Sequence, residues 1–181
     1  VVGYEIQKTL AVVDWYKKSW PAKPVGVIGR GEGGLITQYA AAVDTRIDAA
    51  CVSGYFDSRQ NIWQEPIDRN VFGLLEQFGD AELVSLIAPR PFIVDAACGP
   101  EATIPGGRGA PSRVVTPALG SVKEELARAE RLIEKLEPPA KLRLVEGGQK
   151  PLTGQALGQF LKSLTADAAL GQAGEDNITH L

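Results

Sequence analysis

The feature that most constrains the fold is a glycine-rich turn that joins a short apolar segment to a helical one. Val25–Ile28 is apolar and rich in β-branched residues, which favours a strand. Four glycines follow between positions 29 and 34, and Leu35–Val43 then has the pattern of a helix. A strand that turns directly into a helix is typical of a parallel sheet with helical crossovers.

The rest of the chain continues this alternation. Strands are predicted at Ala49–Ser53, Pro91–Ala96 and Lys141–Val145, and helices at Tyr4–Ser19, Asn70–Gln77, Ala81–Ile87, Ser121–Leu136 and Gly154–Leu164. Ser121 is predicted to cap its helix, with Glu124 completing a capping box. The order predicts an α/β fold, a three-layer sandwich whose mostly parallel strands follow one another in sequence. We expect residues 1–164 to form this domain and residues 165–181 to form a flexible tail or linker.

The amino-acid composition argues against several classes of binding partner. The net charge is -3 and basic residues do not cluster, which argues against nucleic acid; no apolar run is long enough for a membrane span. Cys51 and Cys98 form no disulfide framework, and His180 is the single histidine, so neither a metal nor a cofactor is predicted. The chain lacks methionine, so we expect it to be processed or to be part of a longer protein. The sequence does not determine the cellular compartment of the protein.

The glycine turn fits two motifs. Gly29, Gly31 and Gly34 have the spacing of the dinucleotide fingerprint, which predicts a nucleotide-binding module. The acid that should end the next strand is missing, because Asp48 precedes that strand. Glu32 would also place a negative charge where a pyrophosphate should bind. A nucleotide-binding module therefore remains an alternative interpretation of the glycine turn.

The second motif is the Gly-x-Ser-x-Gly turn, which raises a serine nucleophile above a sheet. The serine position is Gly31. Either glycine relieves strain there, or the missing side chain opens space for a ligand to approach backbone N–H groups. Glu32, at the start of the helix, either stabilises the helix dipole or acts as a general base.

Two further segments carry a family resemblance. Asp44–Tyr55 and Leu86–Val94, together with the turn, resemble the C-terminal half of an α/β-hydrolase of the dienelactone hydrolase and acetyl xylan esterase type. The resemblance implies that the four strands are the last four of eight. It also implies that a missing N-terminal half, or a partner subunit, covers the edge formed by Val25–Ile28.

The family's triad falls on residues unsuited to its chemistry. The nucleophile position is Gly31, the acid position is Glu101, with Asp95 inside the preceding strand, and the histidine position is Gln149. Glycine cannot attack a carbonyl, and glutamine cannot accept a proton near neutral pH. The resemblance therefore implies a catalytically degenerate domain with a structural or ligand-binding role in a larger protein. An active carboxylesterase or carbohydrate deacetylase whose nucleophile lies outside this chain is the alternative.

The remaining candidates for a binding site lie where the strands end. Arg30 and Glu32 belong to the turn, and Ser53, Tyr55 and Arg59 follow the second predicted strand. Open α/β sheets bind ligands at this edge, so we expect these residues to bind a polar acyl or sugar ligand. A collapsed cleft filled by Tyr55 or Trp63 is the alternative. The region from Cys98 to Ala118 is predicted to be a long loop without regular structure, and Cys98 has no nearby histidine to activate it.

Overall fold

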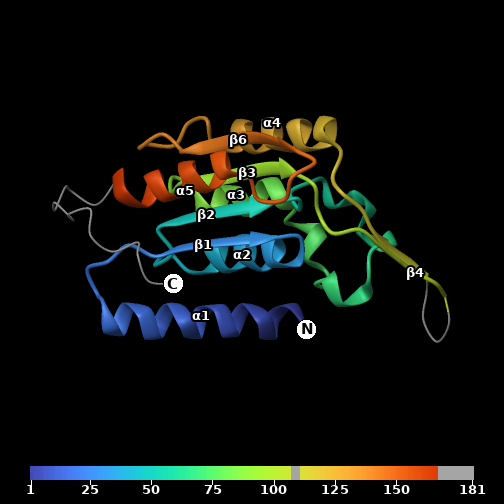
Figure 1. Cartoon of the computed structure of the whole chain (residues 1–181), viewed down its shortest axis with the longest axis horizontal. Helices are drawn as coiled ribbons and strands as arrows, with labels where there is room; N and C mark the ends of the chain where they lie inside the picture. Colours follow the sequence, from blue (N-terminus) through green and yellow to red (C-terminus); the bar gives the residue numbers. More distant parts are fainter. Residues whose placement is uncertain (107–110, 167–181) are drawn as a thin grey trace.

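The protein has an α/β architecture built on one parallel sheet (Figure 1). The computed structural model describes residues 1–106 and 111–166. The sheet contains β1 (Gly26–Arg30), β2 (Ala49–Ser53), β3 (Phe92–Ala97) and β6 (Leu142–Gly148), in the order β1-β2-β3-β6. Every neighbouring pair is parallel. The predicted fold class and the sequential strand order are confirmed.

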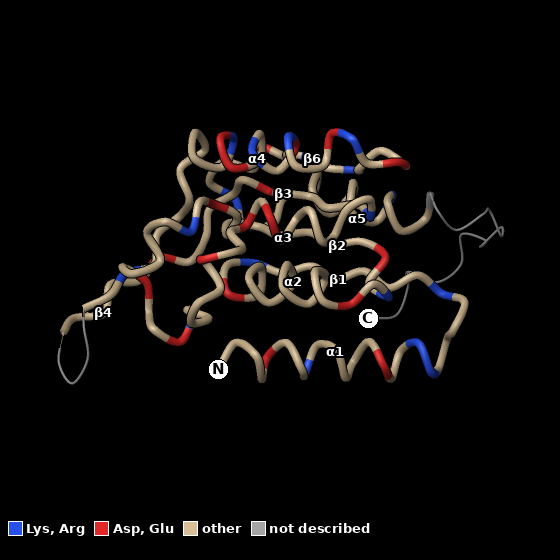
Figure 2. Tube along the Cα trace, turned by 180° about the vertical axis from the view of Figure 1, so that it is seen from behind, with Lys and Arg blue, Asp and Glu red and all other residues tan. Residues whose placement is uncertain are grey.

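Helices cover both faces of the sheet. The helices α2 (Glu32–Val43), α3 (Asp80–Ile87) and α4 (Leu119–Ile133) share one hydrophobic cluster with the sheet, and α5 (Gly154–Ala166) shares another. Val94 of β3 belongs to the first cluster and its neighbour Ile93 to the second, because successive strand side chains point to opposite faces. Figure 1 shows α5 in front of the sheet, with α2 and α3 behind it. Charged residues of both signs follow one another along α4 (Figure 2).

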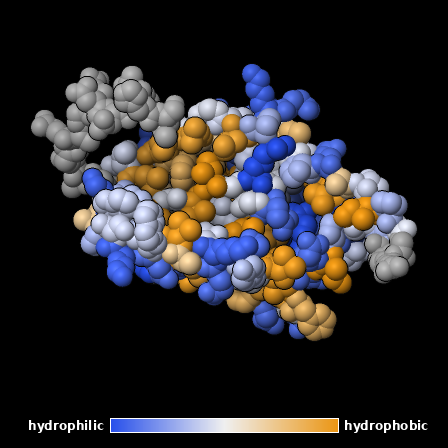
Figure 3. All heavy atoms as spheres, turned by 60° about the horizontal axis from the view of Figure 1, so that its bottom comes forward, coloured by the Kyte–Doolittle hydropathy of each residue, from blue (hydrophilic) through white to orange (hydrophobic). Residues whose placement is uncertain are grey.

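The outer edge of the sheet is β1. Within the described residues β1 pairs only with β2, and α1 (Val2–Ser19) lies beyond that edge (Figure 1). Large side chains of α1 remain exposed on its outer side: Tyr4, Val12 and Trp15. Figure 3 brings this side of the molecule forward and shows apolar and polar areas next to each other on it. No helix among residues 1–106 and 111–166 combines the length and the apolar character that crossing a membrane requires.

Two predicted helices differ in the structure. Asn70–Gln77 is not an α-helix: Gly73 has a φ of 76°, and only a short 3-10 helix, η3 (Leu74–Glu76), follows it. The helix α4 begins earlier than expected and has Ala118 at its N-cap, so the predicted capping box is wrong. The hydroxyl of Ser121 donates instead to the Asp57 carboxylate, a contact between distant segments that local sequence cannot reveal.

The predicted loop after Cys98 also contains regular structure. The strands β4 (Ala102–Ile104) and β5 (Ser112–Val114) form an antiparallel ribbon, so the expectation of an irregular loop is wrong. The ribbon extends away from the sheet (Figure 1). At the C-terminus, α5 continues through Ala166, two residues past the predicted domain boundary. The rest of the predicted tail, with His180, lies outside the described residues.

Candidate functional site

Four chain segments meet at the carboxyl end of the sheet. The Arg30 side chain donates to the carbonyl oxygen of Cys98 at 3.3 Å, and the Cys98 N–H donates to the carbonyl oxygen of Gly148 at 2.9 Å. Gly54 and Gly99 approach so closely that a Cβ on Gly54 would lie 2.6 Å from the Gly99 Cα. The structure therefore brings together the glycine turn, the segment after β2, the start of the β4 loop and the turn after β6.

The turn at Gly31 has the geometry of a strand-to-helix elbow. Gly31 has φ 54° and ψ -117°, which L side chains rarely adopt, and its N–H donates to the Ser53 carbonyl oxygen at 2.9 Å. A Cβ on Gly29 would overlap the carbonyl of Gly33, so the turn can close only with glycine at position 29. Both residues thus have the steric role expected of glycines in such a turn.

The space above Gly31 is filled. A Cβ on Gly31 would overlap the ring of Pro100, which lies over the position where an elbow nucleophile would stand. The hypothesis that a missing side chain opens a ligand site directly above Gly31 is therefore wrong. The residue that fills the space is Pro100 rather than Tyr55 or Trp63: Tyr55 packs beneath Gly34, and Trp63 is 76% exposed.

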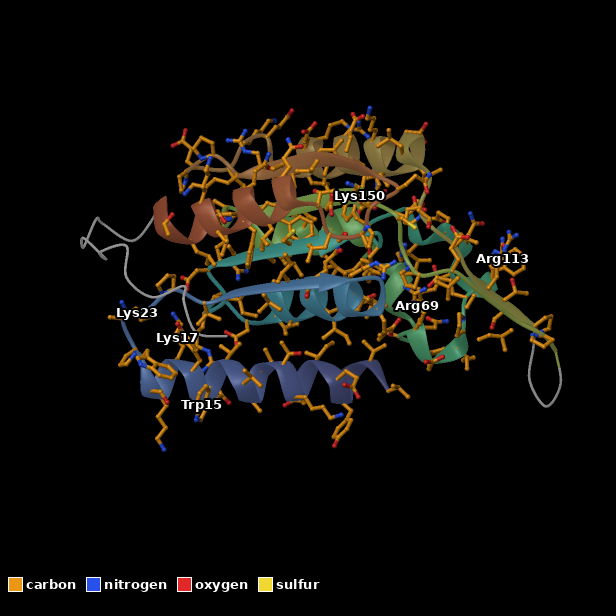
Figure 4. The ribbon with its side chains drawn as sticks, in the orientation of Figure 1. Trp15, Lys17, Lys23, Arg69, Arg113 and Lys150 are labelled. Carbon is orange, nitrogen blue, oxygen red and sulfur yellow. The ribbon has the colours of Figure 1, made fainter. Side chains whose placement is uncertain are left out.

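A polar cavity of about 150 Å³ lies beside Gly31. It is lined by three arginines, two carboxylates and several neutral polar groups: Arg59, Arg69, Arg113, Asp57, Glu65, Ser58, Asn61, Gln64 and Ser121. Gly54, Tyr55, Val114, Val115 and Pro117 complete the wall. Figure 4 shows Arg69 and Arg113 at the end of the molecule toward which β1 and β2 point, opposite Lys17 and Lys23. Of the residues predicted for binding, Tyr55 and Arg59 line this cavity.

Buried ion pairs hold one wall of the cavity in place. Arg59, with 7% of its side chain exposed, pairs with Glu65 at 3.2 Å and with the fully buried Asp80 at 3.5 Å. Arg69, equally buried, pairs with the other oxygen of Glu65 at 3.0 Å and with Glu32 at 2.8 Å. Each arginine thus faces two carboxylates. The carboxylates largely neutralise the charges of the two arginines. Arg59 and Arg69 therefore stabilise the wall of the cavity rather than bind a ligand.

Burial shifts the titration of several groups here. Desolvation raises the pKa of Asp80 to about 6 although Arg59 opposes the shift. Desolvation also raises the pKa of Tyr39 to about 12 and that of Glu32 above its ordinary value, the latter despite the attraction of Arg69. Burial opposes the charge of Arg59, but Asp80 and neighbouring groups outweigh it and hold the Arg59 pKa above its usual range.

Ser53 and Asp95 form a second buried network behind the turn. The Ser53 hydroxyl donates to Asp95 Oδ2 at 2.8 Å and accepts from the Leu152 N–H at 3.1 Å. Asp95 also accepts from the N–H of Thr153 at 3.1 Å and from its hydroxyl at 3.2 Å. Asp95 is 1% exposed and Ser53 is fully buried, so this pair anchors the segment after β6 and does not line the cavity.

The other residues predicted for the site lie outside the cavity. Arg30, Glu101 and Gln149 are exposed, and Glu101 Oε1 accepts from the Thr116 N–H at 3.3 Å. Glu32 is half exposed and reaches the cavity only through Arg69. Within the described residues no three His, Cys, Asp or Glu side chains gather as metal ligands. His180, the single histidine of the sequence, falls outside that part of the chain.

Asp48, considered for nucleotide binding, has a structural role at the opposite end of the sheet. Its Oδ2 accepts from the Val25 N–H at 2.7 Å and pairs with Lys17 at 3.2 Å. The carboxylate therefore fixes the entry into β1, away from the glycine turn.

Sequence reasoning missed the residues that shape the site most. Pro100, Asp80 and Arg69 belong to different segments of the chain, and only the fold brings these segments to the site. Asp80 has the sequence signature of an acidic residue in a first helical turn, which indicates helix stabilisation rather than a buried ion pair. Local signals at Arg113 likewise do not show that the β4–β5 ribbon returns to Gln64, at the end of the 3-10 helix η1 (Arg59–Gln64).

Comparison with known proteins supports the hydrolase interpretation at the level of fold. No family model matches the chain. YtaP of Bacillus subtilis (strain 168), a protein named provisionally as a hydrolase, is 33% identical in an alignment of 100 residues that covers 50% of this chain and 33% of that protein.

Solved esterases have a similar structure. A glucuronoyl esterase from Solibacter usitatus aligns with a TM-score of 0.58 and 17% identity over 89% of this chain and 47% of the esterase. A glucuronoyl esterase from Teredinibacter turnerae aligns with a TM-score of 0.60 and 15% identity, over 91% of this chain and 46% of the esterase. The esterase Pf2001 of Pyrococcus furiosus aligns with a TM-score of 0.51 and 17% identity, over 87% of this chain and 60% of the esterase. The protein thus shares the α/β fold of these esterases over about nine-tenths of its length, and it spans about half the length of the two glucuronoyl esterases.

Proposed function

We propose that this chain is a catalytically degenerate α/β-hydrolase-like domain with a structural or ligand-binding role in a larger protein. The observation that carries the proposal is the pair formed by Gly31 and Pro100. The backbone of the nucleophile turn is kept, while a proline ring fills the place of the nucleophile side chain. A Ser–His mechanism requires an attacking oxygen and a base within hydrogen-bond reach.

The neighbouring groups supply neither requirement. Gln149 replaces the base, and its amide does not accept a proton near neutral pH. Asp95 is buried and occupied by Ser53 and Thr153. Glu32, which has a raised pKa, is bound to Arg69. What remains is a polar cavity with hydrogen-bonding walls, which suits a polar acyl or sugar ligand better than bond cleavage.

The partner that we propose is the N-terminal half of the fold, or a subunit that replaces it, placed along β1. The outer edge of β1 has no neighbouring strand among the described residues, and free strand edges are normally covered. On α5, Leu157 and Leu161 lie one helical turn apart and are 38% and 53% exposed, so they offer apolar surface on the same face of the sheet as Ile28.

Two assays test the proposal. The chain should not react with a fluorophosphonate probe and should not hydrolyse p-nitrophenyl acetate. The double variant Gly31→Ser, Pro100→Gly should also stay unlabelled, because the base is still missing. Labelling of the original chain at any serine would overturn the proposal.

The competing function is an esterase whose nucleophile lies in another part of the protein. It is favoured by the fact that the chain spans 46–47% of the two glucuronoyl esterases. Assays on a polypeptide that also contains the proposed N-terminal half separate the two hypotheses. Activity there that survives Gly31→Ala would support this second function, and the absence of activity would support the first.

A further inference from the structure

A second hollow, of about 470 Å³, lies next to the cavity beside Gly31. We call it the ribbon groove; it lies between η1 (Arg59–Gln64) and the β4–β5 ribbon. Its apolar wall consists of Trp63, Ile104, Pro105 and Pro111, and its polar rim of Gln64, Thr103, Ser112 and Arg113. Gln64 and Arg113 line both hollows, so the groove and the cavity adjoin at these two residues.

Trp63 presents an aromatic face to solvent inside the groove. It is 76% exposed, although its indole would gain free energy if it were covered. Hydroxyl and amide groups lie along the same groove at Ser112, Thr103 and Gln64. A flat apolar wall with a hydrogen-bonding rim fits a ligand that is itself amphipathic and rigid, as a sugar ring is.

Arg113 adds charge selectivity where the two hollows join. Its Nε donates to Gln64 Oε1 at 2.8 Å, and Nη2 donates to the same oxygen. Arg59 and Arg69 are each paired with carboxylates, whereas the partner of Arg113 among residues 1–106 and 111–166 is the neutral amide of Gln64. The amide orients the guanidinium without neutralising it. An anionic group on a ligand would form charge-assisted hydrogen bonds there.

We propose that the ribbon groove binds an oligosaccharide that carries an anionic substituent, a carboxylate or a sulfate. A sugar ring stacks on Trp63, the anionic group pairs with Arg113, and the adjoining residue of the chain enters the cavity beside Gly31. This inference rests on the ligand-binding half of the proposed function and names the class of ligand.

The test is isothermal titration calorimetry on the 181-residue chain with three matched tetrasaccharides: neutral galactotetraose, tetragalacturonate and sulfated galactotetraose. We expect at least one anionic tetramer to bind about tenfold more tightly than the neutral one, since a charge-assisted hydrogen bond contributes on that order. The two anionic probes distinguish a carboxylate from a sulfate.

Four variants locate the binding. Trp63→Ala and Arg113→Gln should each weaken it about tenfold. Trp15→Ala and Arg131→Gln should leave it unchanged, because these exposed residues line neither hollow (Figure 4 shows Trp15 at the other end of the molecule). The proposal fails if no tetramer binds, if charge makes no difference, or if the two groove variants bind like the controls. It also fails if the original chain carries a protein partner or a second copy of itself on this groove and Trp63→Ala releases it. None of these outcomes depends on fluorophosphonate labelling, so this proposal and the proposed function can fail separately.

Discussion

The ring of Pro100 occupies the volume that a side chain at Gly31 would need. Gly31→Ala should therefore lower the free energy of unfolding by about 1–3 kcal/mol through its backbone conformation alone, and by more where the Cβ meets the ring. Urea denaturation measures the change. Gly33→Ala is the matched control, since its Cβ would meet nothing within 4 Å and alanine favours a helix. A Gly31→Ala chain as stable as the original would contradict the steric account.

The buried carboxylate of Asp95 should contribute to stability rather than to catalysis. It accepts hydrogen bonds from Ser53 and twice from Thr153, so Asp95→Ala leaves three donors without their partner. We expect a loss of at least about 3 kcal/mol, because each unsatisfied buried donor costs roughly 1–3 kcal/mol. Thermal and urea unfolding should both show the loss. Asp14→Ala, which removes a carboxylate that is 63% exposed, should leave stability unchanged. Equal effects would refute the role of Asp95.

The sheet could be predicted from sequence because its signals are local. Apolar runs such as Ala49–Ser53 and the glycine turn specify strand, turn and helix without reference to distant residues. The same locality explains the errors. Ser121 has the sequence of a helix cap, yet its hydroxyl bonds to Asp57, 64 residues away.

The candidate site was less predictable because its walls come from distant segments. The turn and Arg59 were identified, since both follow strands whose ends meet at one edge of the sheet. Neither the ring over Gly31 nor the ribbon that brings Arg113 to Gln64 has a local signature. Glycine and proline in the loop after Cys98 indicated irregular chain, although part of it pairs as strands.

The protonation of Asp80 should give stability a distinctive pH dependence. Its pKa is about 6 in the folded protein and near 3.8 in an unfolded chain. Between pH 4 and pH 6 the folded state keeps a proton that the unfolded state has released, so this group makes stability fall as pH rises. Asp80→Asn removes the effect. The stability of the variant relative to the original chain should rise across this window by up to about 3 kcal/mol and stay constant above it.

Urea unfolding of both proteins at half-unit pH intervals checks that prediction. The difference between the two curves is the relevant quantity, because the negative charges of Asp57 and Glu125 also act on Asp80. A difference that does not change between pH 4 and pH 6 would show that Asp80 stays ionised throughout.

Arg59 should be the residue whose loss is most costly near neutral pH. It is the closest cation to the buried Asp80 carboxylate, and Arg59→Gln leaves that charge without its counter-ion. Removing one partner of a buried ion pair typically costs about 3–5 kcal/mol. Because Arg59 lowers the Asp80 pKa, its removal raises that pKa further, and Asp80 then takes up a proton more readily. The loss should therefore be largest at pH 7 and clearly smaller at pH 5. Lys8→Gln is the control, since Lys8 and its partner Glu5 are 54% and 37% exposed, and its effect should be small at both values. An Arg59→Gln loss of equal size at both pH values would mean that the arginine stabilises the wall through packing and its hydrogen bonds to the backbone, and not through the charge of Asp80.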